Sequence, residues 1–381
     1  MPSYSGVWTL QAQMQAEAAG NWPKPPVFRE LYAWGPNNLG QLGLVDTVNR
    51  SSPAQVGADA DWAQVSAGEN FATSVKTNGT LWSWGYNGQG RLGLNDTVSR
   101  SSPVQIGALT AWNKVSCGKR HMLAVKNDGT LWSWGRNYYG QLGTGNTTDR
   151  SSPVQVGALT TWIAVSAGYD FSFAIKTDGT MWSWGQGSQG RLGLNNTSSL
   201  SSPVQIGSLT TWSSVATGSN FCFARKTDGT IWSWGYNVFG ASGLNDTNNR
   251  SSPVQIGALT TWEKINAGQQ NAFAITTSGT LFAWGQGGSG QLGDSSTANR
   301  SSPVQVGALT TWANVAGGNS FTIANKTDKT LWVWGSGSDG KLGLNNTTSY
   351  SSPKQVGSLT TWSIIPTQLT MSSSTFAIEV S

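Results

Sequence analysis

Residues 171–185 of the chain are FSFAIKTDGTMWSWG. Two short segments rich in aromatic and aliphatic side chains, FSFAIK and TMWSW, flank a few residues that favour a turn. Asp-Gly is a preferred pair for a two-residue β-hairpin turn, because both central residues of that turn adopt positive φ. The stretch therefore predicts a β-hairpin with Asp178 and Gly179 at its turn.

The hairpin belongs to a unit that recurs with a period of 50 residues. Each unit carries the triplet Ser-Ser-Pro, which begins at Ser51, Ser101, Ser151, Ser201, Ser251, Ser301 and Ser351. Two more strands are expected in each unit, for example around residues 154–156 and 162–166. A period of about 40 to 50 residues with strand-like content is typical of β-propeller blades.

The two ends of the repeat array are incomplete in complementary ways. The first copy begins at residues 31–35 (LYAWG), and the last copy ends with the strand that the first one lacks, residues 376–380 (FAIEV). Pairing of these segments completes one unit and removes the unpaired strand edges of an open array. We therefore expect an all-β, seven-bladed propeller over residues 31–381, closed by its N- and C-terminal strands, with a separate arm over residues 1–30.

The composition excludes several classes of protein. Of the 381 residues 37% are hydrophobic, which is enough for a large core and argues against disorder. No apolar run approaches the ~18 residues that a membrane span needs, and the first residues lack the pattern of a signal peptide. The net charge is only +5, and basic residues occur about once per repeat, so we expect no nucleic-acid surface.

Residues 81–94 (LWSWGYNGQGRLGL), with the preceding Ala67-Gly68-x-x-Phe71, resemble the repeat of the regulator of chromosome condensation family. The resemblance extends over about residues 31–380. It implies a seven-bladed propeller with terminal strand closure, and functions such as guanine-nucleotide exchange or enzyme inhibition through a protein partner. The chain departs from the family at one position, where the family usually has His and only His121 keeps it.

Few residues are suited to catalysis, and we expect the protein not to be an enzyme. His121 is the single histidine, which offers no nucleophile–base pair; it is either a family position without function or a functional residue. Cys117 and Cys222 fall in different blades, so neither a disulfide nor a zinc site is expected, and no cofactor or metal is predicted. The recurring Gly90-Arg91-Leu92-Gly93 is no phosphate loop; its glycines are expected at positive φ or at close approaches between strands.

Two other polar patterns recur with the repeat. Asn95-Asp96-Thr97 and its copies are either turns with side-chain-to-backbone hydrogen bonds or an oxygen-lined ring. Basic residues precede Ser-Ser in five copies, either as solvated turns or as a ring that binds an anionic partner; they are Arg50, Arg100, Arg150, Arg250 and Arg300.

The copies differ mainly in the residues after Trp-Gly and after Ala-Gly. Equivalent loops of a propeller share one face of the disc, and exposed Tyr, Phe and Arg often dominate recognition. These loops are either a partner-binding surface or the result of sequence drift. The candidate partner-binding residues are Tyr86, Arg120, Arg136, Tyr138, Tyr139, Tyr169, Tyr236 and Phe239.

The arm contains a possible short helix over residues 9–19 followed by a Pro-rich linker. Residues 5–13 (SGVWTLQAQ) and 19–23 (AGNWP) resemble a segment found in structural proteins of tailed phages, especially marine ones. Such a helix either caps the propeller or docks on a partner, since a helix this short is marginal alone. The candidate docking residues are Trp8, Leu10, Met14 and Trp22.

Two classes of function remain open on the sequence. The arm favours a non-enzymatic, tail-associated structural protein of a phage particle, made in the host cytoplasm and located in the virion. Its partners would be other virion proteins, through the arm, and a host surface receptor or glycan, through the propeller. The alternative is a regulatory or inhibitor-type propeller that binds a protein partner.

Overall fold

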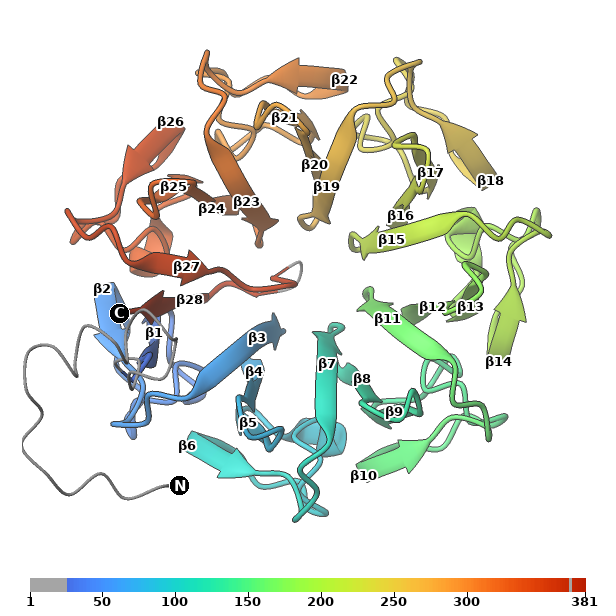
Figure 1. Ribbon diagram of the computed structural model, residues 1–381, viewed down its shortest axis with the longest axis horizontal. Helices are drawn as coiled ribbons and strands as arrows, with labels where there is room; N and C mark the ends of the chain where they lie inside the picture. The colour runs from blue at the N-terminus through green and yellow to red at the C-terminus, as the bar shows by residue number, and fades with distance from the viewer. Residues whose placement is uncertain (1–25, 370–371) are drawn as a thin grey trace, which may run out of the picture.

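The computed structural model of the protein describes residues 26–369 and 372–381. Seven four-stranded antiparallel sheets are arranged around a common axis and form a disc, as Figure 1 shows. We name the sheets A to G, beginning with the one that contains both chain ends. The predicted seven-bladed β-propeller is therefore confirmed.

Each sheet is built from four strands that occupy equivalent positions. The innermost strands are β3 (Trp62–Gly68), β7 (Trp112–Cys117), β11 (Trp162–Ala167), β15 (Trp212–Thr217), β19 (Trp262–Ala267), β23 (Trp312–Gly317) and β27 (Trp362–Ile364). The second strands are β4 (Phe71–Lys76), β8 (His121–Lys126), β12 (Phe171–Lys176), β16 (Phe221–Lys226), β20 (Asn271–Thr276), β24 (Phe321–Lys326) and β28 (Thr375–Val380).

The outer half of each sheet is equally regular. The third strands are β5 (Leu81–Gly85), β9 (Leu131–Gly135), β13 (Met181–Gly185), β17 (Ile231–Gly235), β21 (Leu281–Gly285), β25 (Leu331–Gly335) and β1 (Arg29–Gly35). The outermost strands are β6 (Arg100–Gln105), β10 (Arg150–Gln155), β14 (Leu200–Gln205), β18 (Arg250–Gln255), β22 (Arg300–Gln305), β26 (Tyr350–Gln355) and β2 (Arg50–Gln55). The described residues also contain three short 3₁₀ turns, η1 (Gly88–Gly90), η2 (Ser188–Gly190) and η3 (Ser338–Gly340).

The disc is closed by its two chain ends, as predicted. In sheet A, β28 pairs antiparallel with β1, with Tyr32 opposite Ala377, and on its other side with β27. Phe376, Ala377 and Ile378 are buried in this sheet. The C-terminal strand is therefore an interior strand of its sheet, and its loss would expose two strand edges.

The hairpin prediction is correct in position but wrong in turn type. Gly179 has φ +75°, whereas Asp178 does not adopt positive φ. The Gly179 amide donates to the Lys176 carbonyl (2.9 Å), and the Lys176 amide donates to the Thr180 carbonyl (3.0 Å). This is a three-residue loop in which a type I turn is followed by a left-handed glycine. The Asp178 carboxylate instead accepts the Thr180 amide, at 2.9 Å.

The outermost strand begins earlier than predicted. In sheet C, β10 starts at Arg150 and includes the Ser-Ser-Pro triplet, whereas the sequence placed a strand only around residues 154–156. Proline is tolerated there because an edge strand leaves one side of its backbone unpaired. The pairing register with β9 accordingly shifts between Arg150 and Val154.

Adjacent sheets are joined by a repeated contact between a tryptophan and a glycine loop. Trp184 of sheet D is fully buried, and its Nε1 donates to the Gln141 carbonyl of sheet C (2.9 Å). Gly143 lies against the same ring at φ +72°, and a Cβ there would be only 2.8 Å from Nε1. The prediction that these glycines serve positive φ and close approach is therefore confirmed.

A lysine at the end of each second strand, in five of the sheets, lies over two indole rings. In sheet D the Lys176 ammonium is 3.7 Å from the centre of the Trp182 ring and 5.0 Å from that of Trp162. The aliphatic part of the lysine covers the apolar rings, while its charge interacts with their π-systems. These lysines therefore belong to the packing of each sheet.

Lys329 occupies the left-handed position that glycine holds in the other hairpins, with φ +62°. A non-glycine residue in this conformation costs about 1–2 kcal/mol, part of which glycine loses again through its larger unfolded-state entropy. We expect Lys329→Gly to raise the free energy of unfolding by about 1 kcal/mol in urea titrations. The reverse change, Gly179→Lys, should lower it, and a stability loss in Lys329→Gly would contradict this account.

Candidate functional site

The variable loops lie together on one face of the disc, which we call the loop face. It carries the connections after the first strand of each sheet (residues 69–70 and their equivalents) and after the third strand (residues 86–99 and their equivalents). The two sets touch, because the Tyr86 amide donates to the Asn70 carbonyl (2.8 Å) and the Arg136 amide to the Arg120 carbonyl (2.9 Å). The opposite face, which carries the hairpin turns, we call the turn face.

Most of the predicted partner-binding residues gather on the loops of sheets B, C and D. We name this group, with the cations that contact it, the basic–aromatic cluster: Tyr86, Arg91, Lys119, Arg120, Arg136, Tyr138, Tyr139 and Tyr169. The Tyr138 and Tyr139 rings meet edge to face, with centroids 4.8 Å apart. The side chain of Tyr138 is 64% exposed, so the cluster presents an aromatic surface to solvent.

Cations lie against the rings of the cluster. The Arg91 guanidinium is 4.8 Å from the Tyr86 ring centre, the Arg136 guanidinium 5.5 Å from that of Tyr138, and the Lys119 ammonium 3.9 Å from that of Tyr169. Cation–π contacts of this kind hold the aromatic side chains in one orientation. The cluster is therefore partly preorganised for binding.

Two carboxylates lie among these cations and do not neutralise them. Glu69 accepts a hydrogen bond from Arg120 Nε (3.1 Å) and lies 3.4 Å from the Lys119 ammonium. Asp170 is buried, accepts from Gln141 (3.0 Å), and has its pKa raised by that burial. Burial also lowers the pKa of Arg91 to about 10, so its guanidinium remains charged at neutral pH. The cluster carries an excess of positive charge.

Tyr236 and Phe239 do not belong to this cluster. They lie half-buried on the corresponding loop of sheet E, and neither ring contacts a cation among the described residues. The inner loops of sheets E, F and G are polar and uncharged, with Ser219, Asn220, Gln269, Gln270, Asn319 and Ser320. The predicted site residues are thus divided between one charged region and one neutral region of the loop face.

The four residues predicted to dock the arm, Trp8, Leu10, Met14 and Trp22, lie outside the described residues, as does the predicted helix.

The central channel of the disc is crossed by residues 365–369 and 372–374, which we call the channel segment. The stretch of sequence from Trp362 to Phe376 is five residues longer than the equivalent stretch from Trp312 to Phe321. This extra length is the feature of the sequence that indicates an additional segment. Figure 1 shows the chain leaving β27 towards the axis of the disc before it returns to β28. Sequence reasoning did not predict where these extra residues go.

Gln368 is the centre of the channel segment and is only 5% exposed. Its side-chain oxygen accepts from Ser116 of sheet C, and its side-chain nitrogen donates to the Ala167 carbonyl of sheet D and to Thr217 Oγ1 of sheet E (3.0 Å). Its carbonyl accepts the Ala67 amide of sheet B (3.0 Å). One side chain and its backbone therefore connect four sheets.

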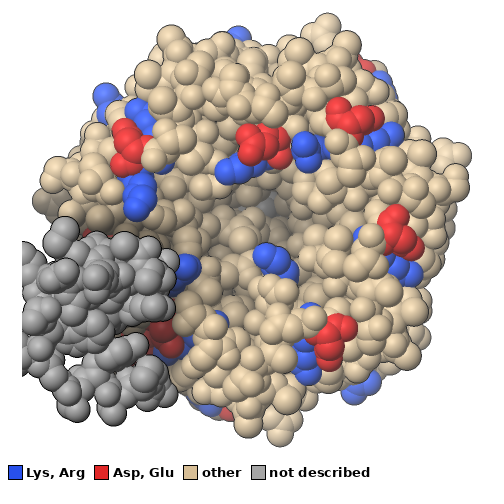
Figure 2. All heavy atoms as spheres, in the orientation of Figure 1, with Lys and Arg blue, Asp and Glu red and all other residues tan. Residues whose placement is uncertain are grey.

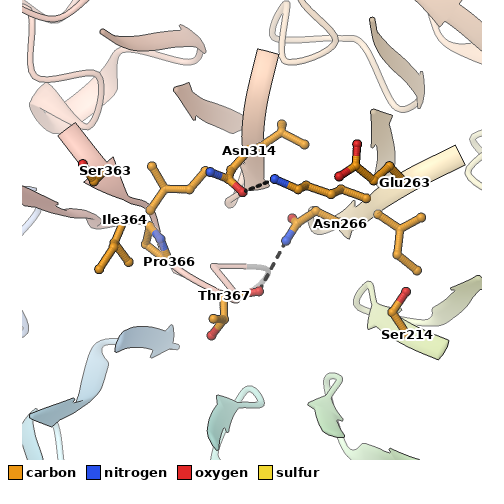
Figure 3. Close-up of a pocket in the computed structure, with 12 residues that line it drawn as sticks. Ser214, Glu263, Asn266, Asn314, Ser363, Ile364, Pro366 and Thr367 are labelled. Carbon is orange, nitrogen blue, oxygen red and sulfur yellow. Dashed lines mark hydrogen bonds between the residues drawn. The ribbon is translucent and has the colours of Figure 1, made fainter. Parts of the chain in front are cut away.

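The channel segment also reaches the remaining sheets. Asn266 of sheet F donates to the Thr367 carbonyl (3.3 Å), as Figure 3 shows, and the Asn319 amide of sheet G donates to the Ser372 carbonyl (2.9 Å). A cavity of about 470 Å³ remains beside the segment at the turn face, between sheets F and G and Pro366. At the loop face a smaller hollow of about 290 Å³ opens between Lys119, Tyr169 and Ser373. The basic–aromatic cluster therefore borders one mouth of the channel.

Replacing Gln368 by leucine should remove the hydrogen bonds of its side chain to Ser116, Thr217 and the Ala167 carbonyl. Because a buried hydrogen bond contributes about 1 kcal/mol, we expect the free energy of unfolding to fall by about 2–3 kcal/mol. The control is Gln105→Leu, which removes one exposed hydrogen bond, to the Gly107 carbonyl. Chemical denaturation of both variants checks this, and equal stability of the two would contradict a structural role for Gln368.

The single histidine and the two cysteines are buried. His121 is fully buried with Nε2 2.9 Å from Ser172 Oγ, and burial lowers its pKa to about 3. Cys117 and Cys222 are buried free thiols, and burial raises the pKa of Cys117 to about 12.

Within residues 26–369 and 372–381, no three His, Cys, Asp or Glu side chains form a group that could hold a metal ion. In the same part of the chain, no helix has the length and apolarity needed to cross a bilayer.

The repeated arginines do not form an anion-binding ring. Four of the five lie beside an aspartate, with Arg100 2.6 Å from Asp96 and Arg250 2.6 Å from Asp246. Asp96 also accepts the Val98 amide (2.9 Å), so the Asn-Asp-Thr copies of this kind are turns. On the face turned to the viewer in Figure 2, acidic side chains likewise lie beside basic ones at intervals around a hollow centre.

Comparison with known proteins agrees with this architecture. The model of the RCC1-like domain matches residues 30–377. The structure of human WBSCR16 is similar at 20% identity, with a TM-score of 0.80, over 92% of this chain and 98% of that one. Prp20p from Saccharomyces cerevisiae, studied for its binding to Gsp1p and histones, is similar at 18% identity with a TM-score of 0.81, over 93% and 91%.

A third similar structure is that of Kap60 bound to yeast RCC1 (Prp20), at 18% identity and a TM-score of 0.81, over 100% of this chain and 94% of that one. At these identities the likeness to solved structures concerns the fold alone. No curated protein matches the sequence.

Proposed function

The chain belongs to the RCC1-like domain family, and on that basis we propose that it is a non-enzymatic propeller that binds and regulates a partner protein. The observation that carries the proposal is the basic–aromatic cluster on the loop face. Tyr and Arg are the residue types that most often dominate protein interfaces, and here several of them lie side by side and partly ordered. The surface is therefore suited to a protein partner.

The charge of the cluster indicates the chemistry of the partner surface. Arg120 and Lys119 share Glu69, while Arg136 contacts no carboxylate among the described residues. A partner that places carboxylates opposite these cations would be favoured, because complementary charge increases both the association rate and specificity. The similar yeast protein Prp20p is described as binding proteins, Gsp1p and histones, which supports the class of partner but not its identity.

The test compares proteins captured from a cell lysate by the full chain and by its variants, followed by binding measurements on purified candidates. We expect Tyr138→Ala with Tyr139→Ala, and separately Arg136→Ala, to weaken the specific interaction at least tenfold without changing the melting temperature. Lys114→Ala, which removes an exposed cation from the turn face, is the matched control. An interaction that Lys114→Ala weakens as much as the cluster variants would refute the proposal, as would one that all variants keep.

A more specific proposal concerns the place where this recognition occurs. Residues 5–13 and 19–23 resemble a segment of tailed-phage structural proteins, and they precede the strands of the disc in the sequence. We propose that the arm attaches the protein to other virion proteins and that the propeller is displayed on the particle, with its loop face towards a host surface receptor or glycan. Under this proposal the protein is made in the host cytoplasm and located in the virion.

Virion association is tested separately from partner binding. Mass spectrometry of purified particles should detect the chain, and a chain lacking residues 1–22 should fold with an unchanged melting temperature but fail to enter particles. Absence of the full chain from particles would overturn the virion proposal and leave the loop-face proposal intact. Normal incorporation of the shortened chain would overturn the role of the arm.

A further inference from the structure

At the junction of sheets C and D the chain departs from the usual repeat at three successive residues. Where sheet B has Leu94-Asn95-Asp96, sheet C has Thr144-Gly145-Asn146. All three changes remove volume or charge. A Cβ on Gly145 would meet only Ser202 Oγ, at 3.7 Å, so the space beside it is open.

The third change leaves Arg150 without the partner that its equivalents have. Arg50, Arg100 and Arg250 each pair with an aspartate four residues earlier, at 2.5–2.6 Å, and Arg300 pairs with Asp294 at 2.7 Å. Asn146 replaces that aspartate for Arg150. The neighbouring Asp149 is engaged elsewhere, since it accepts the Asn137 amide at 2.6 Å. Arg150 makes no ion pair among the described residues, and its Nε is buried without a hydrogen-bond partner.

A cavity of about 480 Å³ opens at this junction, between the outer strands β10 and β14 that Figure 1 shows at the rim. Its apolar wall is formed by Leu159, Trp182 and Pro203, and its polar wall by Arg150, Asn146, Gln155 and Ser202. Leu159 is 48% exposed, so its apolar surface is available to a ligand.

The amide of Gln155 is also available to a ligand. Three of its six equivalents, Gln105, Gln205 and Gln255, each donate to a glycine carbonyl two residues later, at 3.0 Å. Gln155 makes no such hydrogen bond in the described part of the chain, so its amide can donate and accept within the cavity.

The junction of sheets G and A provides a natural comparison. It contains a cavity of about 520 Å³ lined by the equivalent Leu359, Gln355 and Trp362. Tyr350 stands there in place of the arginine, and none of the residues that line this second cavity is Lys or Arg. The combination of an open cavity with an unpaired arginine therefore distinguishes the junction of sheets C and D.

We propose that the cavity between sheets C and D binds an acidic sugar residue. The Arg150 guanidinium would take the carboxylate through two parallel hydrogen bonds, an arrangement that its planar donors favour. Asn146, Gln155 and Ser202 would bind hydroxyl groups, and the apolar face of the ring would pack on Leu159 and Trp182. Apolar walls with a few convergent polar groups are typical of sites for compact ligands.

An extended acidic peptide fits the cavity less well. Peptides that bind along sheets do so by pairing with the backbone of an edge strand. Both edge strands here carry a proline, Pro153 in β10 and Pro203 in β14, which lacks the required N–H group. The site therefore favours a ligand recognised by side chains, and it lies on the rim rather than on the loop face.

The experiment uses the full chain and D-glucuronate, with D-glucose as the neutral probe, in ligand-observed NMR titrations. We expect saturable binding of glucuronate and at least tenfold weaker binding of glucose. Arg150→Gln should weaken glucuronate binding about tenfold or more, whereas the matched Arg100→Gln should not change it.

A second variant restores the repeat. Thr144→Leu with Gly145→Asn and Asn146→Asp should pair Arg150 with the introduced carboxylate and abolish glucuronate binding while keeping or raising the melting temperature. Absence of saturable glucuronate binding to the wild-type chain would overturn the proposal. So would equal losses in Arg150→Gln and Arg100→Gln, or binding that survives in the restored variant. None of these outcomes depends on the loop-face proposal.

Discussion

A chain that ends after Ser374 is expected not to form a stable disc. This truncation removes β28, the interior strand of sheet A, with the buried side chains of Phe376 and Ile378. Loss of one large buried apolar side chain typically costs about 2–5 kcal/mol, and the whole stability of a domain is only about 5–15 kcal/mol. The edges of β1 and β27 would also be exposed and prone to pair with other chains.

Size-exclusion chromatography and thermal melts followed by circular dichroism measure this effect. We expect aggregation or loss of a cooperative transition for the truncated chain. A chain that lacks residues 1–22 is the control, because those residues precede the strands of the disc, and it should melt like the full chain. A monomeric truncated chain with an unchanged transition would show that closure by the chain ends does not stabilise the disc.

Trp184→Ala should cause a large loss of stability, with the free energy of unfolding in urea titrations lower by about 3–5 kcal/mol. The substitution leaves a cavity beside Gly143 and removes the hydrogen bond to the Gln141 carbonyl of the adjacent sheet. The contribution of the hydrogen bond can be separated from that of packing. Trp34 is equally buried, but its Nε1 has no acceptor within residues 26–369 and 372–381.

Trp184→Phe should therefore lower the free energy of unfolding by about 1 kcal/mol more than Trp34→Phe does. This difference is the ordinary net contribution of one hydrogen bond. Equal losses in the two phenylalanine variants would mean that the contact between sheets depends on packing alone. A loss below about 1 kcal/mol in Trp184→Ala would contradict the central role of this tryptophan.

The sequence was sufficient to predict the fold because each blade repeats the same pattern of strand and turn residues. A period of 50 residues, a glycine in five of the six hairpin turns and complementary incomplete copies at the two ends of the array leave few alternatives to a closed ring. The error at Asp178 has a local cause, since Asp-Gly is compatible with more than one short hairpin loop and the choice depends on backbone pairing. The error at β10 arose because Pro153 reads as a strand breaker unless the strand lies at an edge.

The candidate sites could be predicted from the sequence less completely than the fold. Variation among the copies identified the loops. It did not show that Tyr86, Arg136 and Tyr169 gather on sheets B, C and D, whereas Tyr236 lies apart from them on sheet E. The extra length before Phe376 was visible, whereas the hydrogen bonds of Gln368 connect residues far apart in the chain and have no local signature. The substitution at Asn146 was visible too, but only the structure shows that it leaves Arg150 unpaired.

The channel segment and β28 follow the strands of the six other sheets in the chain. During synthesis those six sheets leave the ribosome before the residues that fill the axis and those that complete sheet A. The disc can therefore close only after residue 380 has emerged, and a product terminated before the channel segment would lack centre and seam together.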